Sequence, residues 1–251
     1  MKKTVLSLLM TVLCVCSMNA YTLYPVPQSI VENGGTVSLS NSINVVMDEG
    51  ISEKIKNFAE EILNDAGLTP VYSDFSQSNS YLYIGINGSD GDADNFADEA
   101  GLSRTVFSGA DNQYDPYVLQ INSLKSAGAI VIIGNEDGSA FYGLATLKQM
   151  LADGTVLQKA TVEDYAYTQY RGIVEGYYGT PYSVESLLSL MEFFKEFKLN
   201  TFIYGPKADP YHAGYWQEDY PVSISDEERQ KGYLTQDDMR RISEKAAECN
   251  V

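Results

Sequence analysis

The sequence predicts an α/β protein, in which an N-terminal α+β sandwich domain precedes the first two βα units of a truncated (β/α)8 barrel. The N-terminal part alternates short apolar runs with two segments of helical period. Two further apolar runs, residues 171–175 and 201–204, flank a third helical segment, which is the order of a parallel βαβ unit. A closed barrel needs eight such units and about 250 residues of its own. We therefore expect this chain of 251 residues to be a fragment of a longer protein.

The N-terminal segment has the pattern of an export signal. Lys2 and Lys3 precede an apolar run at residues 5–15 that is too short to span a bilayer comfortably, and small residues follow it. Residues 1–20 are therefore predicted to be a signal peptide, with no membrane-spanning segment left after cleavage. A lipid anchor on Cys16 is the weaker alternative, because the residues just before it are not the small ones expected there.

Charge and cysteine content restrict the partners and the compartment. The formal net charge is −17, which disfavours binding to nucleic acids and to anionic membrane surfaces. Two of the three cysteines lie in the predicted leader, so Cys249 has no partner for an internal disulfide. An exported protein without disulfides fits a bacterial periplasm or cell exterior better than a disulfide-rich eukaryotic secretion product.

Residues 21–165 are predicted to form the α+β domain, with both long helices on one side of a sheet. The first helix has an N-cap at Ser52 and a stop at Gly67, and its apolar residues share one face. The other expected elements are strands at 36–39, 43–46 and 81–86, a hairpin of 118–121 with 129–133, and a second helix at 140–151.

An acidic segment between two strands invites comparison with a calcium loop. Asp90, Asp92 and Asp94 have the spacing of the first EF-hand ligands. The glycine required at the sixth position is Asn95, however, and the final glutamate position is Gly101. We therefore predict a solvated acidic turn, and we expect no metal or other cofactor.

The second region, residues 166–251, is predicted to begin the barrel. Its helices start at two N-caps, Ser183 and Thr235. Glycine, tyrosine and charged residues gather at 175–181 and 205–212, where the two strands end. Loops at the carboxyl ends of parallel strands hold the chemistry of barrel enzymes, and these two loops have the composition that a sugar site needs.

Two motifs in these loops carry a family resemblance. RGIVEGYYGTPYS at 171–183 and LNTFIYGPKADPYH at 199–212 resemble the start of the catalytic TIM barrel of glycoside hydrolase family 84. These enzymes are β-N-acetylglucosaminidases, including O-GlcNAcases and hyaluronidase-like bacterial enzymes. The preceding region resembles the α+β module found ahead of the barrel in this family and in family 20 hexosaminidases.

The resemblance implies an exo-β-N-acetylglucosaminidase that removes terminal N-acetylglucosamine from a glycan or glycoprotein. The sugar's own acetamido oxygen would attack the anomeric carbon, with retention of configuration, while two neighbouring aspartates orient the acetamido group and transfer protons. That aspartate pair is not in this sequence, so no catalytic residue is assigned. Two substrate contacts carry over, the backbone carbonyl of Gly176 and the ammonium group of Lys207, each to a sugar hydroxyl.

The chemistry of both residues agrees with that assignment. Gly176 has no side chain, so a sugar can lie directly on the backbone there. A hydrogen bond from Lys207 could contribute about 1.5–3 kcal/mol where water is excluded. Alone, each has an ordinary interpretation as a turn glycine or a solvated lysine, but together at adjacent strand ends they favour a site. Ala208 and Tyr182 replace a common acid and a common tryptophan of the family, which leaves fine specificity open.

Other polar residues are given structural roles. Asp237 and Asp238 follow the N-cap of a helix, where adjacent side chains diverge and favour the helix dipole, so they are not the catalytic pair. Glu175 is interpreted as a structural carboxylate that pairs with Lys207 or Arg171.

The single histidine and two aromatic residues limit the possible types of site. His212 is the only histidine, which excludes a histidine-based triad and a multi-histidine metal site. Tyr211 and Trp216 could form an aromatic platform for a sugar or pack inside the fold. The alternative functions are a non-catalytic carbohydrate-binding secreted protein and a family 20-type β-hexosaminidase, which would need an Asp-Glu pair.

Overall fold

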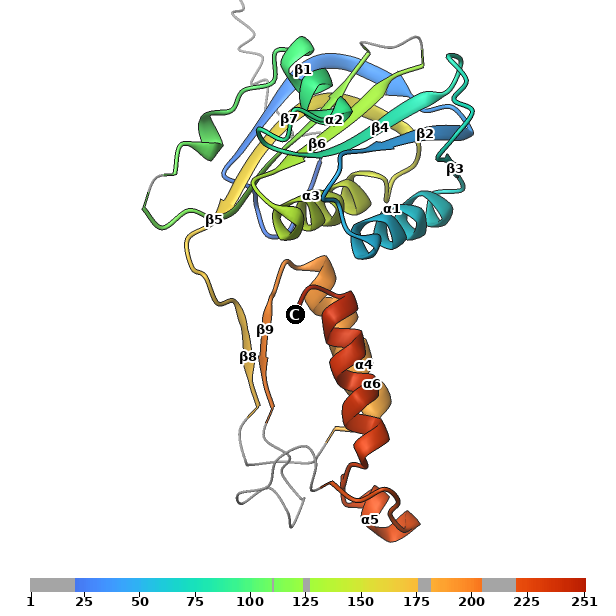
Figure 1. The fold of residues 1–251 in the computed structure, drawn as a ribbon, viewed down its shortest axis with the longest axis vertical. Helices are drawn as coiled ribbons and strands as arrows, with labels where there is room; N and C mark the ends of the chain where they lie inside the picture. The colour runs from blue at the N-terminus through green and yellow to red at the C-terminus, as the bar shows by residue number, and fades with distance from the viewer. Residues whose placement is uncertain (1–20, 110, 124–126, 176–181, 205–219) are drawn as a thin grey trace, which may run out of the picture.

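The computed structural model describes residues 21–109, 111–123, 127–175, 182–204 and 220–251 (Figure 1). The N-terminal part of the chain forms a large sheet with helices packed on it. We call this part the sheet layer (β1–β7 with α1–α3). A smaller unit, which we call the βα unit (β8–α6), follows it and lies against it in Figure 1. The predicted fold class is confirmed.

Seven strands of the sheet layer form one mixed sheet in the order β1-β7-β5-β6-β4-β2-β3. β2, β3, β4 and β6 run parallel, whereas β5 is antiparallel to β6 and β7, and β1 is antiparallel to β7. The predicted hairpin is confirmed, since Val118 lies opposite Ile133. The strands are β1 Ser29–Ser38, β2 Ser42–Met47, β3 Thr69–Val71, β4 Ser80–Ile86, β5 Tyr114–Asn122, β6 Ala129–Gly134 and β7 Val156–Ala166.

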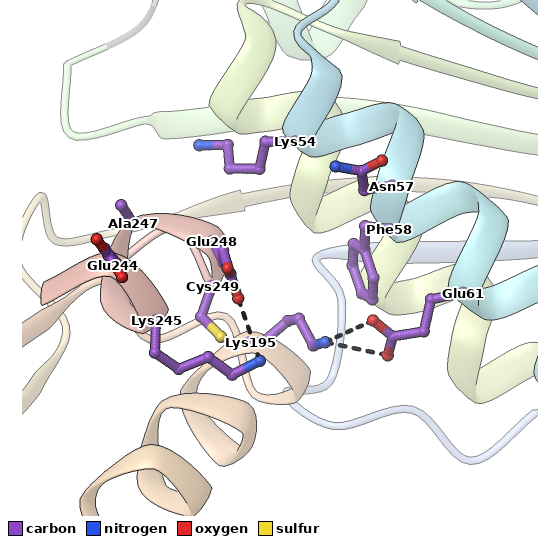
Figure 2. A pocket seen from close by; sticks show the side chains of 10 residues that line it. All are labelled: Lys54, Asn57, Phe58, Glu61, Lys195, Glu244, Lys245, Ala247, Glu248 and Cys249. Carbon is purple, nitrogen blue, oxygen red and sulfur yellow. Dashed lines mark hydrogen bonds and ion pairs between the residues drawn. The ribbon is translucent and has the colours of Figure 1, made fainter. Parts of the chain in front are cut away.

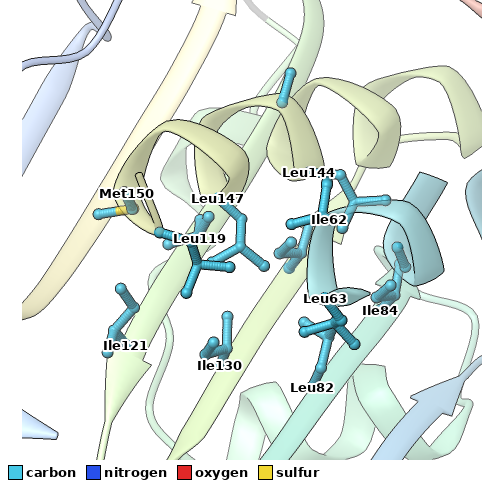
Figure 3. Packing of buried hydrophobic residues seen from close by; sticks show 14 of the residues in the cluster. Ile62, Leu63, Leu82, Ile84, Leu119, Ile121, Ile130, Leu144, Leu147 and Met150 are labelled. Carbon is cyan, nitrogen blue, oxygen red and sulfur yellow. The ribbon is translucent and has the colours of Figure 1, made fainter. Parts of the chain in front are cut away.

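Two helices, α1 (Glu53–Asp65) and α3 (Asp137–Met150), cover one face of the sheet, as predicted (Figure 1). Figure 3 shows their apolar side chains directed toward the strands, with Ile62 from α1 and Leu144 from α3 among them. Each such fully buried side chain contributes about 1.5–3 kcal/mol, which makes this layer the main source of stability. Ser52 is at the N-cap of α1, but its hydroxyl donates to Asp137 Oδ2 (2.9 Å) instead of capping the helix.

The acidic segment at 90–94 differs from its prediction. Asp92 and Asp94 begin a helix, α2 (Asp92–Glu99), which packs on the sheet face opposite α1 and α3. Asp94 is buried and pairs with Arg104 at 2.8 Å, so it is not a solvated turn residue. Within the described residues, no group of His, Cys, Asp and Glu is arranged to hold a metal ion.

The carboxylate of Asp48, the residue directly after β2, caps α2. Asp48 accepts hydrogen bonds from the backbone N–H of Ala93 (2.7 Å) and Asp94 (3.2 Å), and from the Ser89 hydroxyl (2.8 Å). Replacing Asp48 with alanine is expected to lower the free energy of unfolding by about 1–2 kcal/mol, because two donors at the helix start lose their acceptor.

Urea unfolding of Asp48→Ala measures this effect, and Glu99→Ala at the exposed end of the same helix is its control. The control substitution should change the free energy of unfolding by no more than about 0.5 kcal/mol. Equal losses in the two variants would contradict the capping role of Asp48.

The βα unit has the predicted order of strand, helix, strand, helix. β8 (Gly172–Val174) pairs in parallel with β9 (Thr201–Ile203), and α4 (Val184–Glu196) connects them. A short helix, α5 (Asp226–Gln230), precedes α6 (Gln236–Glu248), which packs beside α4 (Figure 1). Both predicted N-caps are confirmed: Ser183 Oγ accepts from the Ser186 N–H, and Thr235 forms a capping box with Asp238.

None of the helices in the described part of the chain is long and apolar enough to cross a membrane.

Candidate active site

Two parallel strands define the end of the βα unit where a site is predicted. Because β8 and β9 run in the same direction, the residues after Val174 and Ile203 leave from the same end. The pairing extends one residue further, since the Glu175 N–H donates to the Ile203 carbonyl at 2.8 Å. The two loops with the family motifs therefore start side by side.

The spacing of the two strands depends on a glycine. Gly172 lies opposite Thr201, and a Cβ at position 172 would overlap with the Thr201 carbonyl group, whose carbon it would meet at 2.6 Å. Contacts below 3.0 Å are essentially never made by real Cβ atoms, so a side chain here would push the strands apart. Gly172 therefore fixes how closely β8 and β9 approach each other.

Arg171 holds the opposite end of the strand pair. Its guanidinium group pairs with Asp115 Oδ2 at 2.7 Å and donates to the carbonyl of Lys198 at 3.0 Å. Its backbone N–H donates to Asn200 Oδ1 at 2.9 Å. Arg171 is thus the point where the start of β8, the start of β9 and strand β5 of the sheet layer are joined.

Glu175 is buried at the exit of β8, with 8% of its surface exposed. The predicted pairing with Arg171 is wrong, because Arg171 lies at the other end of β8 and has Asp115 as its carboxylate partner. The other predicted partner, Lys207, lies outside the described residues. The burial agrees with a structural role for Glu175.

Both predicted substrate contacts, Gly176 and Lys207, lie outside the described residues, as do Tyr211, His212 and Trp216. The structure describes the strand ends that lead to them and leaves their roles as predictions. Ala208 also lies outside the described residues, whereas Tyr182 is half-exposed just before α4.

The interpretation of Asp237 and Asp238 as helix-start charges is confirmed. Asp238 accepts from the Thr235 N–H (2.9 Å) and hydroxyl (2.7 Å), and its carboxylate pairs with Arg229 at 2.6 Å. Partial burial acts to raise the pKa of Asp238, but the hydrogen bonds from Thr235 and the pairing with Arg229 hold it below its usual value. Asp237 is exposed and pairs with Arg240.

A pocket of about 280 Å³ opens between the N-terminal ends of α4 and α6, the end of the βα unit from which the strand exits also leave. Its lining includes Tyr182, Tyr233, Arg229 and Arg241. Phenol and guanidinium groups can donate hydrogen bonds to hydroxyl and carboxylate groups. This pocket could not be predicted from the sequence, because its residues come from separate segments and form no motif.

A second pocket, of about 510 Å³, lies between α1 of the sheet layer and the C-terminal end of α6 (Figure 2). Lys195 Nζ lies 3.0 and 2.9 Å from the two carboxylate oxygens of Glu61, and Lys245 pairs with Glu248 at 3.4 Å. Desolvation, followed by the charge of Glu192, raises the pKa of the Cys249 thiol to about 11. The Cys249 thiol therefore keeps its proton at neutral pH, which makes it a poor nucleophile.

Two family models match consecutive parts of the chain. Residues 20–165 match "Glycosyl hydrolase family 20, domain 2", and residues 171–230 match "beta-N-acetylglucosaminidase". The first match covers more than half of the 251 residues. The second match begins at Arg171 and therefore includes both strand exits.

Known proteins support the same assignment. The chain is 38% identical over 56 residues to the Protein O-GlcNAcase of Rattus norvegicus, an alignment that covers 22% of this chain and 6% of the relative. The solved structure of CpGH84D is similar with a TM-score of 0.72 and 29% identity, over 93% of this chain and 43% of that one. The N-acetyl-beta-hexosaminidase of Streptomyces plicatus shares the fold, with a TM-score of 0.60, 14% identity, and coverage of 91% of this chain and 44% of that one.

The chain spans less than half the length of these relatives. The matches nevertheless extend over both the sheet layer and the strand exits of the βα unit. The chain therefore belongs to the glycosyl hydrolase family 20, domain 2, family through its sheet layer, and it continues into a β-N-acetylglucosaminidase segment similar to family 84 enzymes.

Proposed function

We propose that the protein containing this chain is an exo-β-N-acetylglucosaminidase that hydrolyses terminal N-acetylglucosamine from glycoconjugates. The observation that carries the proposal is the position of the β-N-acetylglucosaminidase match, which spans the parallel strands and their exits. In this proposal residues 21–165 are the N-terminal domain, and residues 166–251 begin a (β/α)8 barrel.

The proposed reaction uses the substrate as its own nucleophile. The acetamido oxygen bonds to the anomeric carbon as the bond to the leaving oxygen breaks, and an acid gives that oxygen a proton. Water then opens the oxazoline and restores the acetamido group, with net retention. The acid and the group that orients the acetamido N–H are expected at a later strand end, as two adjacent aspartates.

The contribution of this chain is to bind and orient the sugar. In the proposal, the Gly176 carbonyl accepts a hydrogen bond from one sugar hydroxyl and the Lys207 ammonium group donates one to another. The pairing of β8 with β9 supports this geometry, since the loops that hold the two residues start side by side. A hydrogen bond that strengthens in the transition state accelerates the reaction, whereas one of constant strength only improves binding.

The proposed setting is outside the cytoplasm. Lys2, Lys3 and the apolar run that follows support export through a cleaved leader at residues 1–20. The partner is then a glycan or glycoprotein that carries N-acetylglucosamine, in the periplasm or at the cell exterior. The net charge of −17 agrees with a neutral sugar substrate and disfavours nucleic acids.

Hydrolysis of a nitrophenyl N-acetyl-β-glucosaminide tests the proposal, with the full-length protein compared with this chain alone. The full-length protein should release nitrophenol, and residues 21–251 should not, because the catalytic acids are expected beyond them. Activity of residues 21–251 would show that the acids were placed wrongly. Binding of N-acetylglucosamine by the full-length protein without hydrolysis would instead favour a carbohydrate-binding protein.

The match of residues 20–165 to a family 20 domain supports a second candidate, a family 20-type β-hexosaminidase. The two enzyme classes differ in the acids that follow in the open reading frame. Two adjacent aspartates at a later strand end support the family 84-type mechanism, and an Asp-Glu pair supports the family 20 type.

A further inference from the structure

A buried polar cluster connects the start of β9 with the sheet layer. We call Lys198, Asp164, Tyr117 and Thr146 the junction cluster; they come from the β9 approach, β7, β5 and α3, respectively. Lys198 Nζ lies 2.8 Å from Asp164 Oδ2 and 2.8 Å from the Tyr117 hydroxyl. That hydroxyl donates to Asp164 Oδ2 at 3.0 Å and lies 2.6 Å from Thr146 Oγ1. All four side chains are buried.

The charges in this cluster depend on one another. Desolvation lowers the pKa of Lys198, and the carboxylate of Asp164 opposes that effect. Desolvation and then the charge of Asp164 raise the pKa of Tyr117 well above its usual value, so the phenol keeps its proton and donates it. Removing either charged partner would leave the other buried and uncompensated, which is strongly destabilising.

The same cluster determines the backbone from which both strands start. Lys198 has a φ of +58°, in the left-handed region that lysine rarely occupies, and its carbonyl accepts from Arg171 Nε. Arg171 directly precedes β8, and Lys198 lies three residues before the first residue of β9. Each of these strands has three residues, so only a few pleated peptide units separate the cluster from the strand exits.

A contribution to folding stability does not by itself explain the buried ion pair between Lys198 and Asp164. A buried ion pair is often no more stabilising than apolar side chains of similar volume, because both charges must be desolvated. A cluster of directed hydrogen bonds, however, permits one arrangement of its partners. Productive geometry at a catalytic site tolerates only about 0.5 Å of displacement, and a misplacement of about 1 Å can cost a factor of about 100 in rate.

We infer that Lys198 and Asp164 are positioning residues, which set the placement of β8 and β9 on the sheet layer and thereby the alignment of the two loops after these strands. In this inference both side chains act through the placement of the strands and not by contact with the sugar. The catalytic consequence rests on the proposed function, whereas the placement of the strands does not.

The test uses Lys198→Met, Asp164→Asn and the double variant in the full-length protein. Each single variant should have a lowered thermal midpoint, because one buried charge loses its partner. The double variant contains no unpaired charge and keeps an oxygen at position 164, so its midpoint should return close to that of the wild type. Its kcat should nevertheless stay at least about tenfold below wild type with little change in KM, since the directed contacts are gone.

Recovery of kcat together with the thermal midpoint in the double variant would overturn the inference and leave the cluster a purely stabilising role. Tyr117→Phe removes one hydroxyl from the same cluster and provides a folded variant if the charge variants do not fold. It should lower kcat about threefold or more with a small change in midpoint, and an unchanged kcat would count against the inference.

Hydrogen exchange of the Glu175 amide gives a readout that does not require hydrolysis. This N–H donates to the Ile203 carbonyl across β8 and β9, and its exchange should be at least about tenfold faster in the double variant. An unchanged exchange rate of the Glu175 amide in the double variant would overturn the inference, even if the enzyme were active. A wild-type protein without activity would count against the proposed function and leave the inference about strand placement standing. Lys148→Met is the matched control. Lys148 forms a partly exposed ion pair with Glu196 of α4 (3.0 Å), which also joins the sheet layer to the βα unit. Both kcat and the exchange rate of the Glu175 amide should stay unchanged in this variant.

Discussion

Replacing Gly172 with alanine is expected to destabilise the βα unit by about 3 kcal/mol or more and to separate β8 from β9. The added Cβ would overlap with the carbonyl group of Thr201, which is backbone and cannot move without breaking the strand pairing. Urea unfolding measures the loss of free energy, and hydrogen exchange of the Glu175 amide reports the pairing itself. In the full-length enzyme the same change should also abolish most of the activity.

Gly138→Ala is the matched control, since Gly138 lies in α3 and a Cβ there would meet only the Asn250 side chain at ordinary distances of 3.6 and 3.8 Å. Alanine within a helix is favoured over glycine by about 0.5–1 kcal/mol, so this variant should be as stable as the wild type or slightly more stable. If Gly172→Ala behaved like the control, the close approach of β8 and β9 would be contradicted.

Elements with strong periodicity could be predicted from the sequence. α1 and α3 have apolar residues at helical spacing, and α1 ends where Gly67 adopts a φ of +73°. The hairpin of β5 and β6 was visible because two apolar runs flank a short polar connection. In each case the signal lies within about twenty consecutive residues, so no knowledge of distant contacts is needed.

Elements that depend on distant contacts were missed or shortened. β1 extends to Ser29, but Gly34 and Gly35 interrupt its pattern, and its pairing with β7 joins segments more than one hundred residues apart. β7 was not predicted, although the alternation of its buried residues with more exposed ones is the pattern of a strand with one covered face. α2 is short and acidic, and Asp94 is buried only because Arg104 supplies a counter-charge.

The features of the candidate site that depend on local sequence could be predicted, and those that depend on distant contacts could not. The strand exits, the N-caps and the helix-start role of Asp238 follow from local patterns, and the structure agrees with them. The junction cluster could not be predicted, since Tyr117, Asp164 and Lys198 come together only when the sheet and the βα unit meet. Their residue types show no motif in the sequence.

Removal of the Lys207 ammonium group is expected to cause the largest loss of activity among substitutions within this chain's loops. Lys207→Ala in the full-length enzyme should lower kcat/KM by about tenfold to 150-fold, the equivalent of losing one charged hydrogen bond of about 1.5–3 kcal/mol. Lys159→Ala is the control, because it removes the same charge from β7 in the sheet layer, where Lys159 donates to Ser123.

Steady-state kinetics of wild type, Lys207→Ala and Lys159→Ala on a nitrophenyl N-acetyl-β-glucosaminide is the most direct measurement of whether these strand exits hold the amino sugar. If the two strand exits bind the sugar, Lys207→Ala loses at least about tenfold in kcat/KM and Lys159→Ala loses none, with equal thermal midpoints. Wild-type kinetics in Lys207→Ala would contradict the assignment of a sugar site to these strand exits.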